Sequence, residues 1–154
     1  MTNGDERITV TKLIAAPPSA IFEVIVSPLR HPDIDGSGML TSADEQPALT
    51  KVGDAFQIGM HQDAYGDYRM ENHVTVFEPN TALEWRPQVV GGPGSGVVYG
   101  YVLSPTGDGT EVESYYDWSG IAQERKDAGF KPVVSAEHMT QTLANLASIV
   151  EAGT

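Results

Sequence analysis

Residues 31–38, with the sequence HPDIDGSG, bring together side chains that can bind a metal ion or move a proton. Over residues 33–44 the spacing approaches that of a calcium-binding loop, in which oxygen ligands recur at alternate positions around a central glycine. The residues at the corresponding positions are Asp33, Asp35, Ser37, Gly38, Thr41 and Asp44. A weak cation site is therefore one chemistry that this segment offers.

The residues on either side argue against an EF-hand. Such a loop needs a helix on each side, but Pro28 and Pro32 interrupt the first helix and Pro47 falls in the second. The last ligand would be Asp44, which reaches less far than the glutamate usually found there. We therefore expect residues 31–38 to connect a helix to a strand, with a weak cation site or a catalytic element as the alternatives.

The other reactive side chains form no recognisable catalytic or metal motif. Four histidines are the first candidates for a zinc site: His31, His61, His73 and His138. His61 and His73 are not expected to lie opposite each other, and the strand phase of His73 points it outward. The chain has no GxSxG sequence, and GGPGSG at residues 91–96 lacks the strand, lysine and helix of a phosphate loop. We expect no metal site, no cofactor and no catalytic triad.

A sheet and two helices must position these residues. Alternating apolar residues predict strands at residues 8–14, 54–62, 68–77, 82–88, 96–104 and 110–119. A first helix is predicted at residues 17–28, and a longer one at residues 135–153 with Ser135 as its N-cap. Its apolar stripe consists of Met139, Leu143, Leu146 and Val150. Consecutive antiparallel strands followed by a long helix predict an α+β domain.

Strand phase separates an apolar face from a polar one. Along residues 68–77 the apolar face carries Tyr68, Met70, Asn72, Val74 and Val76. The opposite face carries Arg69, Glu71, His73 and Thr75. We expect the apolar face to meet the apolar stripe of the long helix, provided that no bulge shifts the register.

Length and charge limit the classes of protein and of partner. With 154 residues the chain is expected to form one domain. Its net charge of −12 argues against nucleic acid, which requires clustered lysine and arginine. No apolar run is long enough for a membrane span, and MTNGDERITVTK at the N-terminus does not resemble a signal peptide. Together with the absence of cysteine, this predicts a cytoplasmic protein.

Several segments, taken in order, resemble the START/Bet v 1-like superfamily and its bacterial polyketide cyclase/dehydrase group. They are ITVTKLIAAPPSAIFEVIVSPLRHPDIDGSG, TKVGDAFQIGM, ENHVTVFEPNTALEWRP, YVLSPTGDGTEVESYYDWS and LANLASIVEAG. The resemblance implies a helix-grip fold, in which a curved sheet wraps around a long C-terminal helix and leaves a cavity between them. It also implies binding of lipids, sterols, polyketides or other apolar molecules, with catalysis in some members.

The resemblance and the strand phase together predict the lining of that cavity. The predicted ligand-binding residues are Phe56, Ile58, Met60, Tyr68, Met70, Asn72, Val74, Trp85, Tyr99, Tyr101, Tyr116, Met139 and Leu143. We expect access near residues 31–40 and 91–96. The predicted partner is a small hydrophobic or aromatic molecule, whose identity the sequence does not give. A cyclase or dehydratase using inward Tyr and Asn residues, and an interaction module with a filled cavity, are the alternatives; the oligomeric state is left open.

Overall fold

An antiparallel sheet of seven strands forms the main layer of the computed structural model, which describes residues 6–43, 46–64 and 66–152. The strands are β1 (Arg7–Ile14), β2 (Leu40–Ser42), β3 (Ala55–Gln62), β4 (Gly66–Glu78), β5 (Ala82–Val89), β6 (Val98–Thr106) and β7 (Gly109–Asp117). Their order across the sheet is β1-β7-β6-β5-β4-β3-β2. Consecutive strands from β2 to β7 are therefore neighbours, and the last strand, β7, also pairs with the first, β1.

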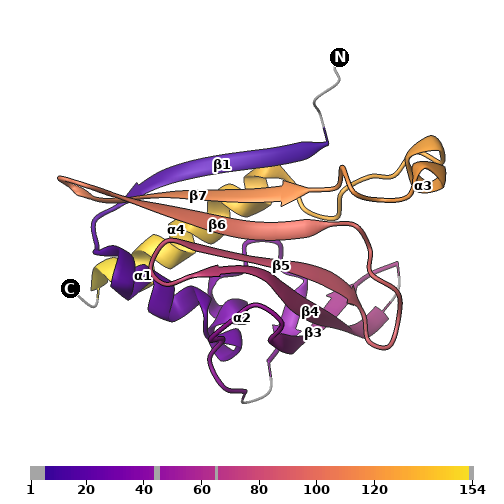
Figure 1. Ribbon diagram of the computed structural model, residues 1–154, viewed down its shortest axis with the longest axis horizontal. Coiled ribbons are helices and arrows are strands. Elements are labelled where there is room, and N and C mark those ends of the chain that lie inside the picture. The colour runs from indigo at the N-terminus through magenta and orange to yellow at the C-terminus, as the bar shows by residue number, and fades with distance from the viewer. Residues whose placement is uncertain (1–5, 44–45, 65, 153–154) are drawn as a thin grey trace.

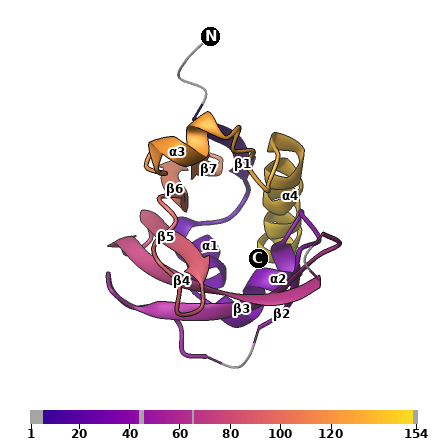
Figure 2. The same cartoon turned by 90° about the vertical axis from the view of Figure 1, so that its right-hand side faces the viewer.

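The longest helices lie on one side of this sheet, and a short one, α3 (Gln123–Asp127), lies beyond the end of β7 (Figure 1). The others are α1 (Pro18–Ile25), the 3-10 helix η1 (Pro28–Arg30), α2 (His31–Ile34) and α4 (Ala136–Ala152). Figure 2 shows the sheet curving from β1 round to β3, with α1, α2 and α4 on its inner side. In Figure 1, α4 runs behind the strands along the long axis of the molecule. The predicted α+β, helix-grip fold is thus confirmed: a curved antiparallel sheet wraps around a long C-terminal helix.

Local chemistry explains where two elements end. The first helix was expected to reach Pro28 but ends at Ile25, because Ser27 takes the extended conformation that a following proline favours. The last strand was expected to reach Ser119 but ends at Asp117, whose carboxylate accepts hydrogen bonds from the Ser119 backbone N–H and hydroxyl. Such a turn competes with continued strand pairing.

A β-bulge in β4 changes which residues face the core. Val74 pairs with Trp85, but Val76, two residues later, pairs with Glu84, which immediately precedes Trp85. The extra residue shifts the phase. Phe77 therefore packs against the core, whereas the sequence pattern had placed Val76 there.

The core fills one end of the concave face. Ile21, Phe22 and Ile25 of α1 are buried and belong to one cluster with Leu143 and Leu146 of α4. A second, smaller cluster contains Tyr116 and Met139 with residues of the loop before α4. Among the residues described, no helix has the length and apolarity needed to cross a membrane.

Candidate functional site: a cavity between the sheet and the C-terminal helix

A cavity of about 550 Å³ lies between the concave face of the sheet, α4 and the segment from His31 to Leu40, hereafter the α2 segment. Its wall includes most of the residues predicted from strand phase. The aromatic and polar members are Phe56, Tyr68, Asn72, Trp85, Tyr99, Tyr101 and Tyr116. The aliphatic members are Ile58, Met60, Met70 and Met139.

Two of the predicted residues lie elsewhere. Val74 and Leu143 are buried, but they pack in the core cluster that contains α1 and do not line the cavity. Strand or helix phase fixes the face on which a residue lies, but not its position along that face. Both belong to the core cluster that also contains side chains of α1.

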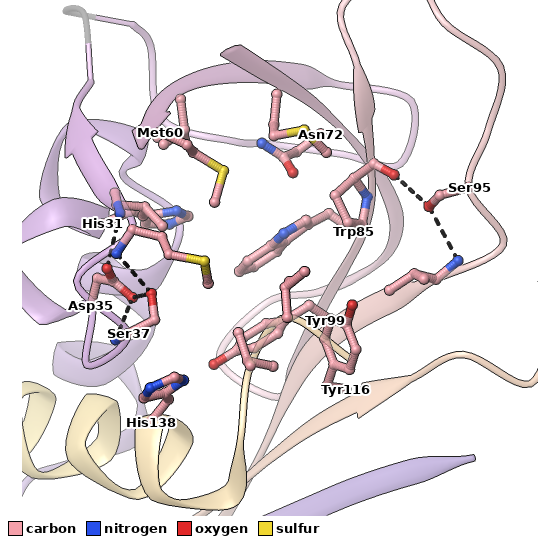
Figure 3. A pocket seen from close by; sticks show the side chains of 18 of the residues that line it. His31, Asp35, Ser37, Met60, Asn72, Trp85, Ser95, Tyr99, Tyr116 and His138 are labelled. Atoms are coloured by element: carbon pink, nitrogen blue, oxygen red, sulfur yellow. Dashed lines mark hydrogen bonds between the residues drawn. The ribbon is translucent and has the colours of Figure 1, made fainter. Parts of the chain in front are cut away.

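The register of the strands places three aromatic rings side by side, and a fourth packs against them. Trp85 of β5 pairs with Tyr99 of β6, and Tyr99 pairs with Tyr116 of β7, so their side chains leave the same face. The Trp85 and Tyr99 rings are stacked, with centroids 5.3 Å apart and an angle of 27° between their planes. Phe56 meets Trp85 edge-on at 5.5 Å. The result is an aromatic wall with Trp85 near its centre (Figure 3).

His31 completes this wall, although sequence reasoning had assigned it to a connection. The residue is 5% exposed, and its imidazole stacks on Trp85 at 5.3 Å and 26°, with the Phe56 ring edge-on at 5.1 Å. The signal that could have identified it is the spacing of His31 and Ile34, which places both side chains on the inner face of a short helical turn.

The segment from Ile34 to Leu40 forms a wall that is attached to α4. The Gly36 backbone N–H donates to Thr142 Oγ1 at 2.8 Å, and Asn145 Nδ2 donates to the Ile34 carbonyl at 3.1 Å. Gly36 lies so close to α4 that an added Cβ would be 2.3 Å from the His138 carbonyl oxygen. The connection therefore shapes the cavity directly, together with Asp35, Ser37, Met39 and Leu40.

The geometry of this segment does not support the calcium-loop alternative. The Asp35 carboxylate accepts hydrogen bonds from the Ser37 N–H, the Ser37 hydroxyl and the Leu40 N–H at 2.7–3.1 Å. Asp33 instead pairs with Arg30 at 3.6 Å, and Asp44 lies outside the described residues. Within the described part of the chain, no three His, Cys, Asp or Glu side chains are grouped to hold a metal ion.

Sequence reasoning also missed the segment before α4. Arg125, Phe130, Val133, Val134 and His138 line the cavity. Ser135 caps α4 as expected, because its Oγ accepts from the His138 backbone N–H at 3.1 Å. In turn, Nδ1 of the His138 ring accepts a hydrogen bond from the Ser135 N–H at 3.2 Å. Ring and hydroxyl thus fix the start of the helix at the cavity wall.

Burial determines the protonation states that matter here. It raises the pKa of Tyr99 and raises that of Tyr101 well above its ordinary value, so both phenols keep their protons and can donate hydrogen bonds. It lowers the pKa of His31, an effect that the Ile25 carbonyl and the Asp35 charge only partly oppose. Asn72 donates to the Phe56 carbonyl at 3.4 Å. The cavity therefore offers flat apolar surfaces and a few neutral polar groups, together with the charged side chains of Asp35 and Arg125.

Comparison with known sequences gives partial matches. No family model matches the chain. Over 83 residues, or 53% of its length, the chain is 34% identical to Uncharacterized protein Rv0088 of Mycobacterium tuberculosis. Uncharacterized protein MT0096, from another strain of that species, is 33% identical over 82 residues. The chain spans only 36% of the length of these relatives.

Comparison with solved structures establishes the fold. Protein CV1439 of Chromobacterium violaceum superposes with a TM-score of 0.67 at 16% identity, covering 95% of this chain and 98% of that one. An AHSA1-like protein of Aeromonas hydrophila gives 0.61 at 17% identity, covering 96% and 93%. DynU16, from the dynemicin biosynthetic locus, gives 0.63 at 17% identity over 97% of this chain and 49% of its own. At these identities the likeness defines the architecture, and that architecture is the helix-grip fold.

Proposed function

We propose that the chain binds a small, largely apolar or aromatic molecule in the cavity between the sheet and α4. The observation that carries the proposal is the cavity itself: its volume of about 550 Å³ falls in the range of small-molecule sites. Its wall combines aromatic and aliphatic side chains with a few polar groups, which is the composition typical of such sites. Of the thirteen residues predicted as ligand contacts, we propose all except Val74 and Leu143, which do not line the cavity.

We further propose that residues 1–154 form one ligand-binding domain of the START/Bet v 1-like superfamily, close to the polyketide cyclase/dehydrase group. The fold shared with the AHSA1-like protein and with the dynemicin-locus protein supports this assignment. A net charge of −12 supports a small molecule, rather than nucleic acid, as the partner. The cytoplasmic location remains a prediction.

Native mass spectrometry of the freshly purified protein tests the binding function. A mass that accompanies the native protein and disappears on denaturation would identify a retained ligand. An apolar fluorescent dye provides the second measurement, because it should bind in the cavity and be displaced by apolar competitors. A protein that carries no extra mass and binds no dye would contradict the proposal.

Two tryptophan substitutions localise the binding. Met60 lines the cavity, so Met60→Trp adds an indole to its interior and should weaken dye binding. Val52 is 57% exposed and does not line the cavity, so Val52→Trp adds the same group to the surface and should leave binding unchanged. Equal dye affinity in the two variants would place the dye outside the cavity.

The alternative function is a cyclase or dehydratase acting on an aromatic or polyketide-like substrate. The observation that favours it is the pair of inward phenols, Tyr99 and Tyr101, which remain protonated and can polarise a carbonyl. Turnover that is lost in Tyr99→Phe or Asn72→Ala, with ligand affinity preserved, would support the enzyme. Binding without turnover of any polyketide-like compound would favour a binding protein.

A further inference from the structure

His31 is held in one orientation by contacts on several sides. Its Nε2 lies 2.7 Å from the carbonyl oxygen of Ile25, at the end of α1. The ring stacks on Trp85 and meets the edge of Phe56. A ring that is fixed by one hydrogen bond and two aromatic contacts presents its remaining nitrogen in a fixed direction.

The partner of Nε2 determines the tautomer. A carbonyl oxygen only accepts hydrogen bonds, so Nε2 must carry the proton and donate it to Ile25. Burial lowers the pKa of His31, so the ring is neutral near physiological pH. In a neutral imidazole the other nitrogen, Nδ1, carries a lone pair and is an acceptor.

Nδ1 borders the cavity. It has no hydrogen-bond partner among the described residues. It is also absent from the fully buried side-chain atoms that lack a partner, so part of its surface is accessible. His31 is nevertheless buried from bulk water. The open space next to this atom is therefore the cavity that the ring lines, where Figure 3 shows His31 beside Met60 and across from Trp85.

We propose that His31 determines specificity, by selecting flat aromatic ligands that present a neutral hydroxyl or N–H donor to its Nδ1 at the Trp85 end of the cavity. The inference rests on the proposed binding function and names the ligand chemistry that it requires. A ligand ring that lies on the aromatic wall places its substituents at the level of the His31 imidazole. An apolar or acceptor substituent there leaves a buried acceptor unpaired, which lowers affinity.

A pair of ligands that differ in one donor tests the proposal. Isothermal titration calorimetry near neutral pH compares 2-naphthol, which has a hydroxyl donor, with 2-methoxynaphthalene, which has only an acceptor. We expect 2-naphthol to bind about three- to tenfold more tightly, the range that one neutral hydrogen bond provides. Equal affinities would overturn the role of His31 and leave the binding function intact, whereas failure of both ligands and of the apolar dye to bind would overturn both proposals.

Variants assign the preference to one residue. His31→Phe keeps a ring on Trp85 but has no acceptor, so the affinity ratio should fall to about one. His31→Gln can donate to the Ile25 carbonyl and still accept, so it should retain the preference. Tyr99→Phe is the control, because it removes a different polar group from the same wall. The proposal would be contradicted if the affinity ratio of the two ligands stays unchanged in His31→Phe, or if it falls to about one only in Tyr99→Phe.

A measurement on the unaltered protein covers the case in which His31→Phe does not fold. The imidazole ¹⁵N resonances of His31 should show a protonated Nε2 and an unprotonated Nδ1 in the free protein. Addition of 2-naphthol should shift the Nδ1 resonance in the direction expected for a nitrogen that accepts a hydrogen bond. An Nδ1 resonance that does not respond to bound 2-naphthol would refute the assignment.

Discussion

Replacing Gly36 by alanine should loosen the cavity wall by separating the α2 segment from α4. The new Cβ would lie 2.3 Å from the His138 carbonyl oxygen and 2.7 Å from the Thr142 backbone nitrogen. Two backbones must move apart to accept it, which typically costs about 1–3 kcal/mol. The movement also weakens the hydrogen bond from the Gly36 N–H to Thr142 Oγ1, a contribution of about 1 kcal/mol.

Gly107→Ala is a matched control for this change. An added Cβ at Gly107 has no heavy atom within 4 Å, so the same methyl group meets no obstacle there. We expect its free energy of unfolding to stay within about 0.5 kcal/mol of the parent or to rise by up to about 1 kcal/mol, since alanine restricts the unfolded chain. Gly36→Ala should lose about 2 kcal/mol or more, which lowers Tm by about 4–8 °C for a chain of this size.

Urea unfolding of the two variants, with dye affinity measured on the same samples, checks the argument. Because residues 34–40 line the cavity, Gly36→Ala should bind the apolar dye more weakly, while Gly107→Ala should bind it as the parent does. If the two variants are equally stable and bind the dye equally, then the close approach of the α2 segment to α4 does not support the cavity wall, and the reasoning fails.

Three further predictions follow from contacts of single residues. Ser135→Ala removes the oxygen that caps α4 and should lower the free energy of unfolding in urea by about 1 kcal/mol; an unchanged midpoint would show that the His138 ring alone holds the helix start. Tyr115→Phe removes the hydroxyl that donates to Glu84 at 2.7 Å and should cost about 1 kcal/mol in the same assay. Tyr115 does not line the cavity, so dye affinity should not change; a changed affinity would mean that the two faces of the sheet are coupled. Burial lowers the pKa of His31 in the folded state, so below pH of about 6.5 the unfolded chain takes up a proton that the folded chain does not. The free energy of unfolding should therefore fall with decreasing pH through that range, and less steeply in His31→Phe; equal slopes would contradict a buried neutral ring.

Much of the cavity wall was predictable because strand pairing follows a period of two. Once β5, β6 and β7 are adjacent, the phase of Trp85, Tyr99 and Tyr116 places all three side chains on one face. The stripe on α4 is equally local, since Met139 and Leu146 recur at helical spacing and are both buried. Local periodicity was therefore sufficient for the architecture and for most of the predicted lining.

The bulge in β4 and the packing of α1 were not predictable in this way. One extra residue between Val74 and Val76 reverses the phase, so Phe77 faces the core, and no local pattern marks that position. Val74 and Leu143 have the right phase, but they pack within the core and do not line the cavity. Which end of a concave face is filled depends on how a helix far away in the sequence packs against it.

The sequence by itself determined the α+β class, the order of the six longer strands and the two longer helices, and the face of most strand residues, because all of these depend on patterns within short windows. Only the tertiary structure decided the role of HPDIDGSG. Its carboxylates resembled a calcium site in sequence, but Asp35 instead closes a turn on Ser37 and Leu40, and Gly36 lets that turn lie against α4. His31 is carried onto Trp85 by the same packing. Contacts between segments distant in the chain, which no local pattern encodes, turned a predicted connection into one wall of the cavity.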